Sequence, residues 1–115
     1  MLFRSEEEFD QLVAQALDTL PVDLAALMDN VAVFVENQKA GQPGLLGLYE
    51  GVPLTNRGHY YSGHLPDRIT IFRNPIQRRC RSVEEVVEQV RITVVHEVAH
   101  HFGIEEGRLR ELGYG

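Results

Sequence analysis

Tryptophan is absent from this sequence, cysteine occurs once, and no apolar run is long. The single cysteine, Cys80, excludes an internal disulfide and a zinc site built from several thiolates. Its arginine neighbours could favour a reactive thiolate, but an ordinary surface cysteine is the stronger expectation. Because the apolar runs are too short to cross a bilayer, we expect no membrane partner.

Positive charge is also scarce, with 11 Lys and Arg against 17 Asp and Glu and a net charge of −6. This balance disfavours nucleic acid as a partner, since binding to a polyanion depends on basic side chains. The first residues are acidic where a secretory signal would be apolar, so we expect a cytoplasmic location. Acidic residues gather near the N-terminus and arginines between residues 68 and 81, which leaves self-association as a homo-oligomer open.

The length of 115 residues predicts one domain over residues 1–115, and the order of elements predicts the α+β class. A capping box at Ser5 followed by apolar residues at helical spacing predicts a first helix that ends at Pro21. A short second helix is expected over residues 22–28.

Three segments between the helices have the features of strands or loops. Residues 31–35 predict a buried strand, and residues 38–51 predict a loop with at most a short strand near residues 46–49. Residues 68–73 alternate polar and apolar side chains and stop at Asn74-Pro75, which predicts a half-exposed strand at an edge of the sheet.

The element with the clearest signal is a long helix that begins after Ser82 and ends at Gly103. Glu85 completes a capping box with Ser82, and valines recur at helical spacing through the segment. β-branched residues favour strands, but about twenty residues without glycine or proline favour a helix that is buried on most sides. We expect this helix to be the spine of the domain.

The motif HEVAH, residues 96–100, lies within this helix. Residues four apart share one helix face, so the imidazoles of His96 and His100 can bind one ion, and zinc accepts such a pair. Glu97 lies about 100° further round the helix, where it can act as general base on a water that the metal activates. His101 points away from the histidine pair and is expected to be a supporting or surface residue.

A catalytic zinc needs a third protein ligand, and the acidic residues that follow the motif are Glu105, Glu106 and Glu111. Glu106 is the first candidate, because the spacing HxxxHxxGxxE matches the position of the third ligand in compact zincins. Gly103 can take the left-handed conformation that ends a helix and turns the chain back toward a metal. Glu105 is the alternative if the register differs by one residue, and Glu111 comes third.

Three stretches of this sequence resemble a bacterial family of minimal zincin-like proteins described as zinc metallopeptidases. They are LLGLYEGVPLT (45–55), LPDRITIFRNPI (65–76) and VRITVVHEVAHHFGIEEGRLRELGY (90–114). The resemblance implies a zincin-like fold, in which a small mixed sheet packs on a long C-terminal active-site helix and is preceded by N-terminal helices. It implies zinc held by His96, His100 and an acidic residue at position 106. It also implies that Glu97 is the base.

The first functional hypothesis is a zinc-dependent peptidase that acts on a peptide or protein substrate. The strand at residues 68–73 is a candidate for pairing with an extended substrate, although an internal strand with nothing bound is equally expected. The alternatives are a non-catalytic zinc-binding or interaction module and, with less support, a metal-dependent ribonuclease. No oxyanion-stabilising residue is assigned, since each available side chain is more often an ordinary loop residue. These side chains are His59, Tyr60, Tyr61, His64 and Tyr114.

Overall fold

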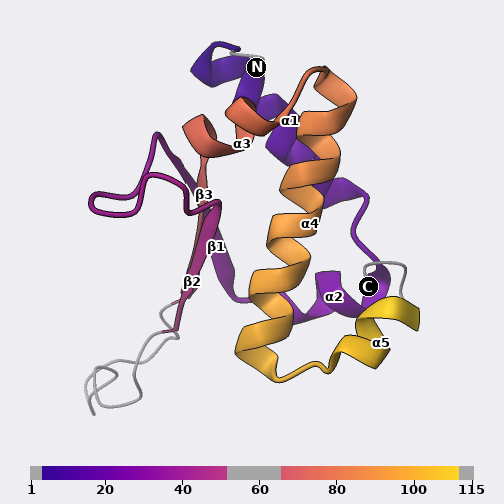
Figure 1. The fold of residues 1–115 in the computed structure, drawn as a ribbon. Helices are drawn as coiled ribbons and strands as arrows, with labels where there is room; N and C mark the ends of the chain where they lie inside the picture. Colours follow the sequence, from indigo (N-terminus) through magenta and orange to yellow (C-terminus); the bar gives the residue numbers. More distant parts are fainter. Residues whose placement is uncertain (1–3, 52–65, 112–115) are drawn as a thin grey trace.

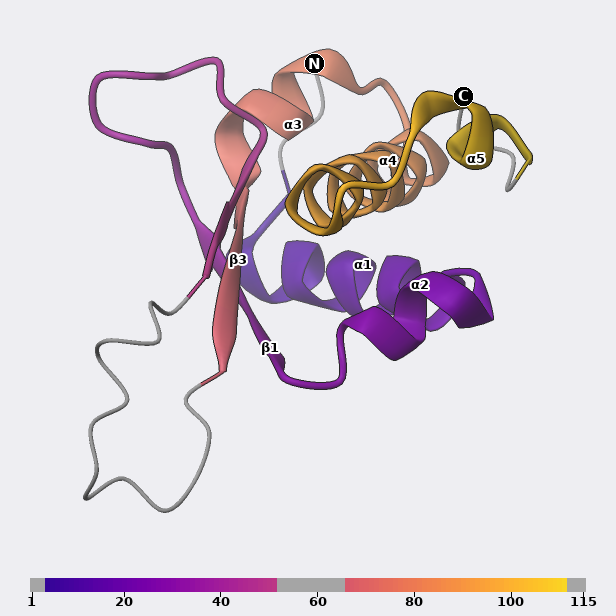
Figure 2. The ribbon, with the colours of Figure 1, turned by 90° about the horizontal axis from the view of Figure 1, so that it is seen from below.

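The computed structural model describes residues 4–51 and 66–111. A three-stranded sheet stands beside the long helix α4 (Val83–Phe102), with helices α1 (Glu6–Asp18) and α2 (Val22–Leu27) on the same side of the sheet (Figure 1, Figure 2). The small mixed sheet, the N-terminal helices and the long C-terminal helix confirm the predicted α+β class. Within the described residues, no helix is both long enough and apolar enough to span a membrane.

Helix α1 begins where the sequence predicts and ends just before Pro21. The Glu8 N–H donates to Ser5 Oγ at 3.2 Å, which is the first bond of the predicted capping box, and the Ser5 hydroxyl donates to Glu8 Oε1 at 3.1 Å. The last helical residue is Asp18. The apolar face of the helix, which includes Phe9, enters the core.

Helix α4 has both predicted ends. At its start, Ser82 Oγ accepts a hydrogen bond of 3.1 Å from the Glu85 N–H. At its end, Gly103 adopts φ 69°, the left-handed conformation that glycine takes without a steric penalty. The Ile104 N–H then bonds back to the Ala99 carbonyl at 2.8 Å, so the chain leaves the helix in a fixed direction.

The sheet has the order β1-β3-β2, with β1 (Val31–Glu36) parallel and β2 (Gly47–Glu50) antiparallel to β3 (Asp67–Phe72). The prediction that residues 68–73 lie at a sheet edge is therefore wrong, because β3 is the central strand. The polar residue Arg68 contributed to the alternation that indicated an edge strand, but its side chain forms an ion pair of 2.7 Å with Glu36 on the neighbouring strand. The strand at residues 31–35, predicted as buried, is an edge strand whose Phe34 is 43% exposed.

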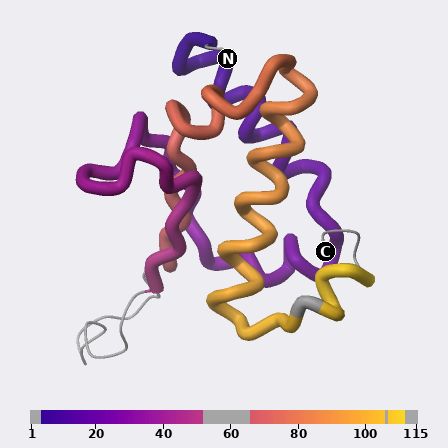
Figure 3. Tube along the Cα trace, viewed as in Figure 1, coloured from indigo at the N-terminus to yellow at the C-terminus, as the bar shows by residue number. Residues whose placement is uncertain are grey.

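Two short helices were not predicted. Helix α3 (Arg73–Arg79) starts directly after β3 and includes Pro75, which is tolerated because the first turn of a helix needs no N–H donor there. Helix α5 (Glu106–Glu111) follows α4 and lies near α2, as the path of the chain in Figure 3 shows. An ion pair of 3.0 Å between Arg108 and Asp23 joins these two elements.

Cys80 is buried, whereas the sequence predicted a surface cysteine. Its side chain is 2% exposed and belongs to the apolar core cluster. Burial raises the pKa of the Cys80 thiol, and the nearby Glu85 carboxylate adds to this rise, while Arg79 opposes it. The thiol is therefore held in its protonated form, which is the opposite of an arginine-activated thiolate.

The core forms where α1 and α4 pack together against β3. Valines at helical spacing along α4 meet apolar residues of the other elements, so a single continuous cluster fills the space between the helices and the sheet. Its members from outside α4 are Phe9, Leu12, Val13, Ala16, Leu24, Ile69, Ile71, Ile76, Cys80 and Leu109.

Candidate metal centre

One row of side chains on α4 faces strand β2. It consists of Thr93, Glu97 and His101, spaced four residues apart, and is called the β2-facing row below. Four residues of helix rise about 6 Å, and two residues of strand advance about 6.7 Å, so the two spacings nearly match. Successive members of the row therefore meet alternate residues of the strand and its end. These alternate residues are Gly47, Tyr49 and Gly51.

The first contact of the row explains why residue 47 is a glycine. A Cβ at this position would lie 2.6 Å from Thr93 Cγ2, closer than carbon atoms approach, and 3.6 Å from Glu97 Cγ. Strand and helix thus pack more closely at Gly47 than any residue with a side chain would allow. This close approach brings the backbone of β2 within reach of the Glu97 carboxylate.

The second contact positions the carboxylate of Glu97. Strands β2 and β3 are antiparallel, and the Phe72 N–H donates to the Leu46 carbonyl. In such a pair, every second residue bonds to the partner strand, so the backbone groups of Tyr49 do not bond to β3. They point instead to the outer edge of β2. The Tyr49 N–H donates to Glu97 Oε1 at 3.1 Å. A side chain of α4 is therefore fixed at the outer edge of the sheet, and within the described part of the chain no hydrogen bond occupies its second oxygen, Oε2.

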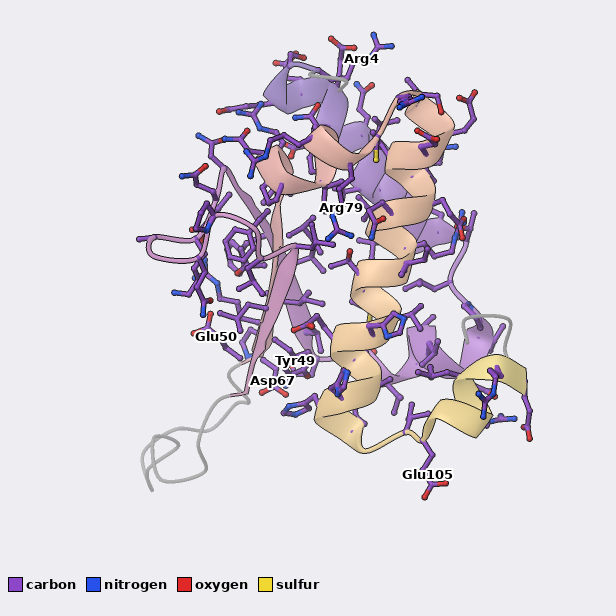
Figure 4. All side chains as sticks on the ribbon, in the orientation of Figure 1. Arg4, Tyr49, Glu50, Asp67, Arg79 and Glu105 are labelled. Atoms are coloured by element: carbon purple, nitrogen blue, oxygen red, sulfur yellow. The ribbon has the colours of Figure 1, made fainter. Side chains whose placement is uncertain are left out.

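The third contact joins the end of α4 to the end of β2. The rings of His101 and Tyr49 stack with centroids 3.9 Å apart. The Tyr49 hydroxyl donates to Asp67 Oδ2 at 2.8 Å, and His101 Nε2 lies 3.7 Å from the same oxygen. Figure 4 shows Tyr49 and Asp67 together at the lower end of the sheet.

Burial raises the pKa of the Tyr49 phenol above its ordinary value. The hydrogen bond to Asp67 and the charge of that carboxylate raise it further. The phenol therefore stays protonated and continues to act as the hydrogen-bond donor that ties β2 to β3.

The two motif histidines lie beside the β2-facing row rather than in it. His96 is partly exposed and His100 is exposed, and helix geometry places them on one face, one turn apart. Within the described residues, neither imidazole has a hydrogen bond or an ion pair, so their nitrogens are available to a ligand. Two imidazoles one turn apart on one helix face are donors whose chemistry suits zinc, which needs a third protein ligand besides them.

The three candidates for the third ligand have different surroundings in the structure. Glu105 is exposed, and in Figure 4 its side chain points away from α4. Glu111 forms an ion pair of 3.0 Å with Arg108. Glu106 begins α5, but its side chain lies outside the described part of the structure. Among the side chains that are described, no three of His, Cys, Asp and Glu gather closely enough to hold a metal. Glu106 as a ligand therefore stays a prediction.

A cavity of about 400 Å³ opens beside the motif. One wall is the segment that leads into β2, and the other is the face of α4 that carries His96 and Glu97. Arg79 of α3 also lines the cavity, which we call the groove below. Among the described residues, the groove is lined by Gly44, Leu45, Leu46, Gly47, Arg79, Gln89, Ile92, Thr93, His96 and Glu97.

Sequence reasoning missed the parts of the site that come from outside the motif. Tyr49 was not singled out, although two glycines four residues apart, Gly47 and Gly51, flank it and could have indicated a strand in close contact with a helix. Arg79 was treated only as part of a charge cluster. The tyrosines and histidines considered for oxyanion stabilisation, at positions 59, 60, 61, 64 and 114, lie outside the described residues.

Comparison with known proteins bears on the family and on the fold. A family model described as zincin-like metallopeptidase matches residues 28–115. A conserved hypothetical protein from Thermus thermophilus has a similar structure, with a TM-score of 0.59 and 25% identity, over 90% of this chain and 99% of that one. No curated protein matches the sequence significantly.

Proposed function

Because the chain belongs to the family of zincin-like metallopeptidases, we propose that it is a zinc-dependent peptidase with Glu97 as its general base. The observation that carries this proposal is the hydrogen bond of 3.1 Å from the Tyr49 N–H to Glu97 Oε1. It holds the Glu97 carboxylate at the outer edge of β2, on the helix that also carries the two imidazoles of the motif. In the proposed site, His96 and His100 hold the zinc, with Glu106 as the third ligand.

The zinc would lower the pKa of a water molecule and polarise the carbonyl of the peptide bond. Glu97 supplies the proton transfers. Since Oε1 accepts the hydrogen bond from Tyr49, Oε2 takes the proton of the attacking water and then delivers it to the nitrogen of the leaving amine. The backbone of β2 therefore acts as the positioning group for the base.

Strand β2 is the element best suited to hold an extended peptide. Its outward backbone groups are those of Gly47 and Tyr49, and an added strand could pair with them except at the Tyr49 N–H, which Glu97 occupies. The sequence suggested residues 68–73 for pairing with a substrate, but β3 is the central strand, so we assign this role to β2 instead. A peptide that pairs antiparallel with β2 runs with its C-terminal side toward residues 44–47 and the groove.

The proposal is tested by elemental analysis together with cleavage of a mixture of unstructured peptides. We expect about one zinc per chain in the wild type and in Glu97→Gln, whereas His100→Ala loses the metal. Glu97→Gln should cleave about 10²- to 10⁴-fold more slowly than the wild type, the contribution expected of a general base. A zinc-loaded wild type that cleaves no faster than Glu97→Gln would refute the enzymatic claim and leave a zinc-binding module.

A further inference from the structure

The groove next to His96 and Glu97 contains one cationic side chain, that of Arg79. In Figure 4 this side chain lies between the sheet and α4. Most of the remaining lining is apolar or uncharged, including Leu45, Leu46 and Ile92. A guanidinium group beside an apolar wall is a suitable receptor for a carboxylate that is attached to an apolar chain.

Arg79 differs from most other arginines of the described chain in having no partner. Arg4, Arg68, Arg73, Arg91 and Arg108 each form an ion pair with a glutamate or aspartate. Arg81 and Arg110 also have no ion pair among the described residues, but neither of them lines the groove. Within residues 4–51 and 66–111, no acceptor binds the Arg79 guanidinium, so its five donors are free for a ligand.

Both walls near Arg79 are held in place by specific contacts. Arg79 is the last residue of α3, which is anchored in the core by the buried Ile76 and Cys80 on either side. Its neighbour Arg78 donates to the Pro43 carbonyl at 2.8 Å, which ties the segment leading into β2 to α3. The base of the Arg79 side chain and the wall opposite α4 are therefore fixed before a ligand arrives.

We propose that Arg79 binds a carboxylate of the peptide substrate on the C-terminal side of the cleaved bond. This inference rests on the proposed peptidase function and adds a substrate class to it. An antiparallel peptide on β2 runs toward Arg79, and the α4 part of the groove, from Glu97 back to Gln89, spans about 12 Å of helix. Because an extended residue covers about 3.3 to 3.6 Å, the carboxylate lies within about three residues of the cleaved bond.

Two groups in a peptide supply this chemistry: the C-terminal carboxylate, and the side chain of an aspartate or glutamate. Binding of uncleaved peptides to the zinc-loaded Glu97→Gln protein distinguishes them. The first pair of probes is acetyl-Ala-Ala-Leu-Ala with a free C-terminal carboxylate and the same peptide with a C-terminal amide. The second pair consists of amidated peptides, acetyl-Ala-Ala-Glu-Ala and acetyl-Ala-Ala-Gln-Ala.

The carboxylate member of at least one pair should bind about tenfold more tightly than its neutral partner, measured by calorimetry at low salt. Adding Arg79→Gln should remove this difference, whereas Arg79→Lys, which keeps the charge, should retain part of it. Arg81→Gln is the matched control, because it removes the same charge from an exposed residue outside the groove and should keep the difference. Raising the salt concentration should weaken only the carboxylate peptides.

The two proposals can fail separately. Equal binding of the acid and neutral peptides in both pairs overturns the role of Arg79, even if the wild type cleaves peptides. A preference that survives Arg79→Gln in a protein with an unchanged melting temperature also overturns it. Conversely, a preference that depends on Arg79, in a protein whose wild type cleaves nothing, supports the carboxylate site and contradicts the peptidase function.

Discussion

One face of α4 packs into the core through valines, whereas the β2-facing row meets the sheet through a few specific contacts. On the valine face every side chain is at most 1% exposed and touches several apolar neighbours. Its members are Val86, Val90, Val94, Val95 and Val98. In the row, Thr93 meets the backbone at Gly47, Glu97 accepts one hydrogen bond, and His101 stacks on one ring.

The difference shows how stability and positioning are divided on a single helix. The hydrophobic effect is non-directional and roughly proportional to the apolar area buried, so the valine face fixes where α4 lies without depending on any one atom. A single hydrogen bond to a carboxylate, such as that from Tyr49 to Glu97, contributes only about 1.5 to 3 kcal/mol net, yet it decides the orientation of that carboxylate. Changes on the two faces should therefore have separable effects, on folding for one and on the site for the other.

The largest expected effect on folding is that of Val90→Ala on the valine face. Val90 is 0% exposed, so removing two carbons and leaving a cavity should lower the free energy of unfolding by about 2 to 3 kcal/mol. Urea denaturation measures this loss. Val22→Ala is the matched control, because Val22 is 83% exposed and should change stability by less than about 0.5 kcal/mol. Reduced zinc binding by folded Val90→Ala would contradict the separation of the two faces.

A smaller effect on folding, with a specific effect on the site, is expected from Gly47→Ala. The new Cβ would lie 2.6 Å from Thr93 Cγ2, so β2 must move away from α4, which costs about 1 to 2 kcal/mol. The same movement lengthens the hydrogen bond between Tyr49 and Glu97, so cleavage should fall while zinc binding persists.

The second variant Thr93→Ser provides the rescue for Gly47→Ala. Serine lacks Cγ2 but keeps the hydroxyl that donates to the Gln89 carbonyl at 2.8 Å. In the double variant the clash with Thr93 Cγ2 disappears, and the new Cβ keeps only a tight contact of 3.3 Å with the Thr70 carbonyl oxygen, so stability and cleavage should both return most of the way to the wild type. A double variant that remains as impaired as Gly47→Ala alone would show that contact with Thr93 is not the cause.

The parts of this molecule that sequence predicts are those determined locally. Ser82, Glu85 and Gly103 define the ends of α4 through bonds to residues at most five positions away, so the pattern suffices. The spacing of His96 and His100 likewise follows from the helix itself. These features need no knowledge of the rest of the chain.

Contacts between distant segments could not be predicted in the same way. Tyr49 and Glu97 are 48 residues apart, and nothing near either one identifies the other. Residues 68–73 show the alternation of an edge strand, because Thr70 is polar although it is only 2% exposed. Which strand lies at the centre depends on pairing across the whole sheet, and the groove near Arg79 depends on that order.

The smallest expected effect on cleavage concerns Tyr49, where the third contact of the row joins β2 to α4. Tyr49→Phe removes the hydrogen bond to the Asp67 carboxylate but keeps the stacking on His101, so it should cost about 1.5 kcal/mol of stability at neutral pH. Glu97 is bonded to the backbone of residue 49, so cleavage should change little. A large loss of cleavage would show that the phenol has a direct role in the chemistry.

The pH dependence of stability provides the sharper test of this contact. The pKa of the Tyr49 phenol is raised by burial and by Asp67, so in the folded state the proton is retained after unfolded tyrosine has lost it. The contribution of the Tyr49 phenol to the free energy of unfolding is therefore complete below about pH 10. Above this pH the contribution declines by about 1.4 kcal/mol per pH unit until the pKa of the folded state is reached. Urea denaturation between about pH 9 and pH 11 should show a steeper decline for the wild type than for Tyr49→Phe. Because the other tyrosines are common to both proteins, the difference between the two slopes isolates Tyr49, and parallel slopes would mean that its phenol is not held as the structure describes.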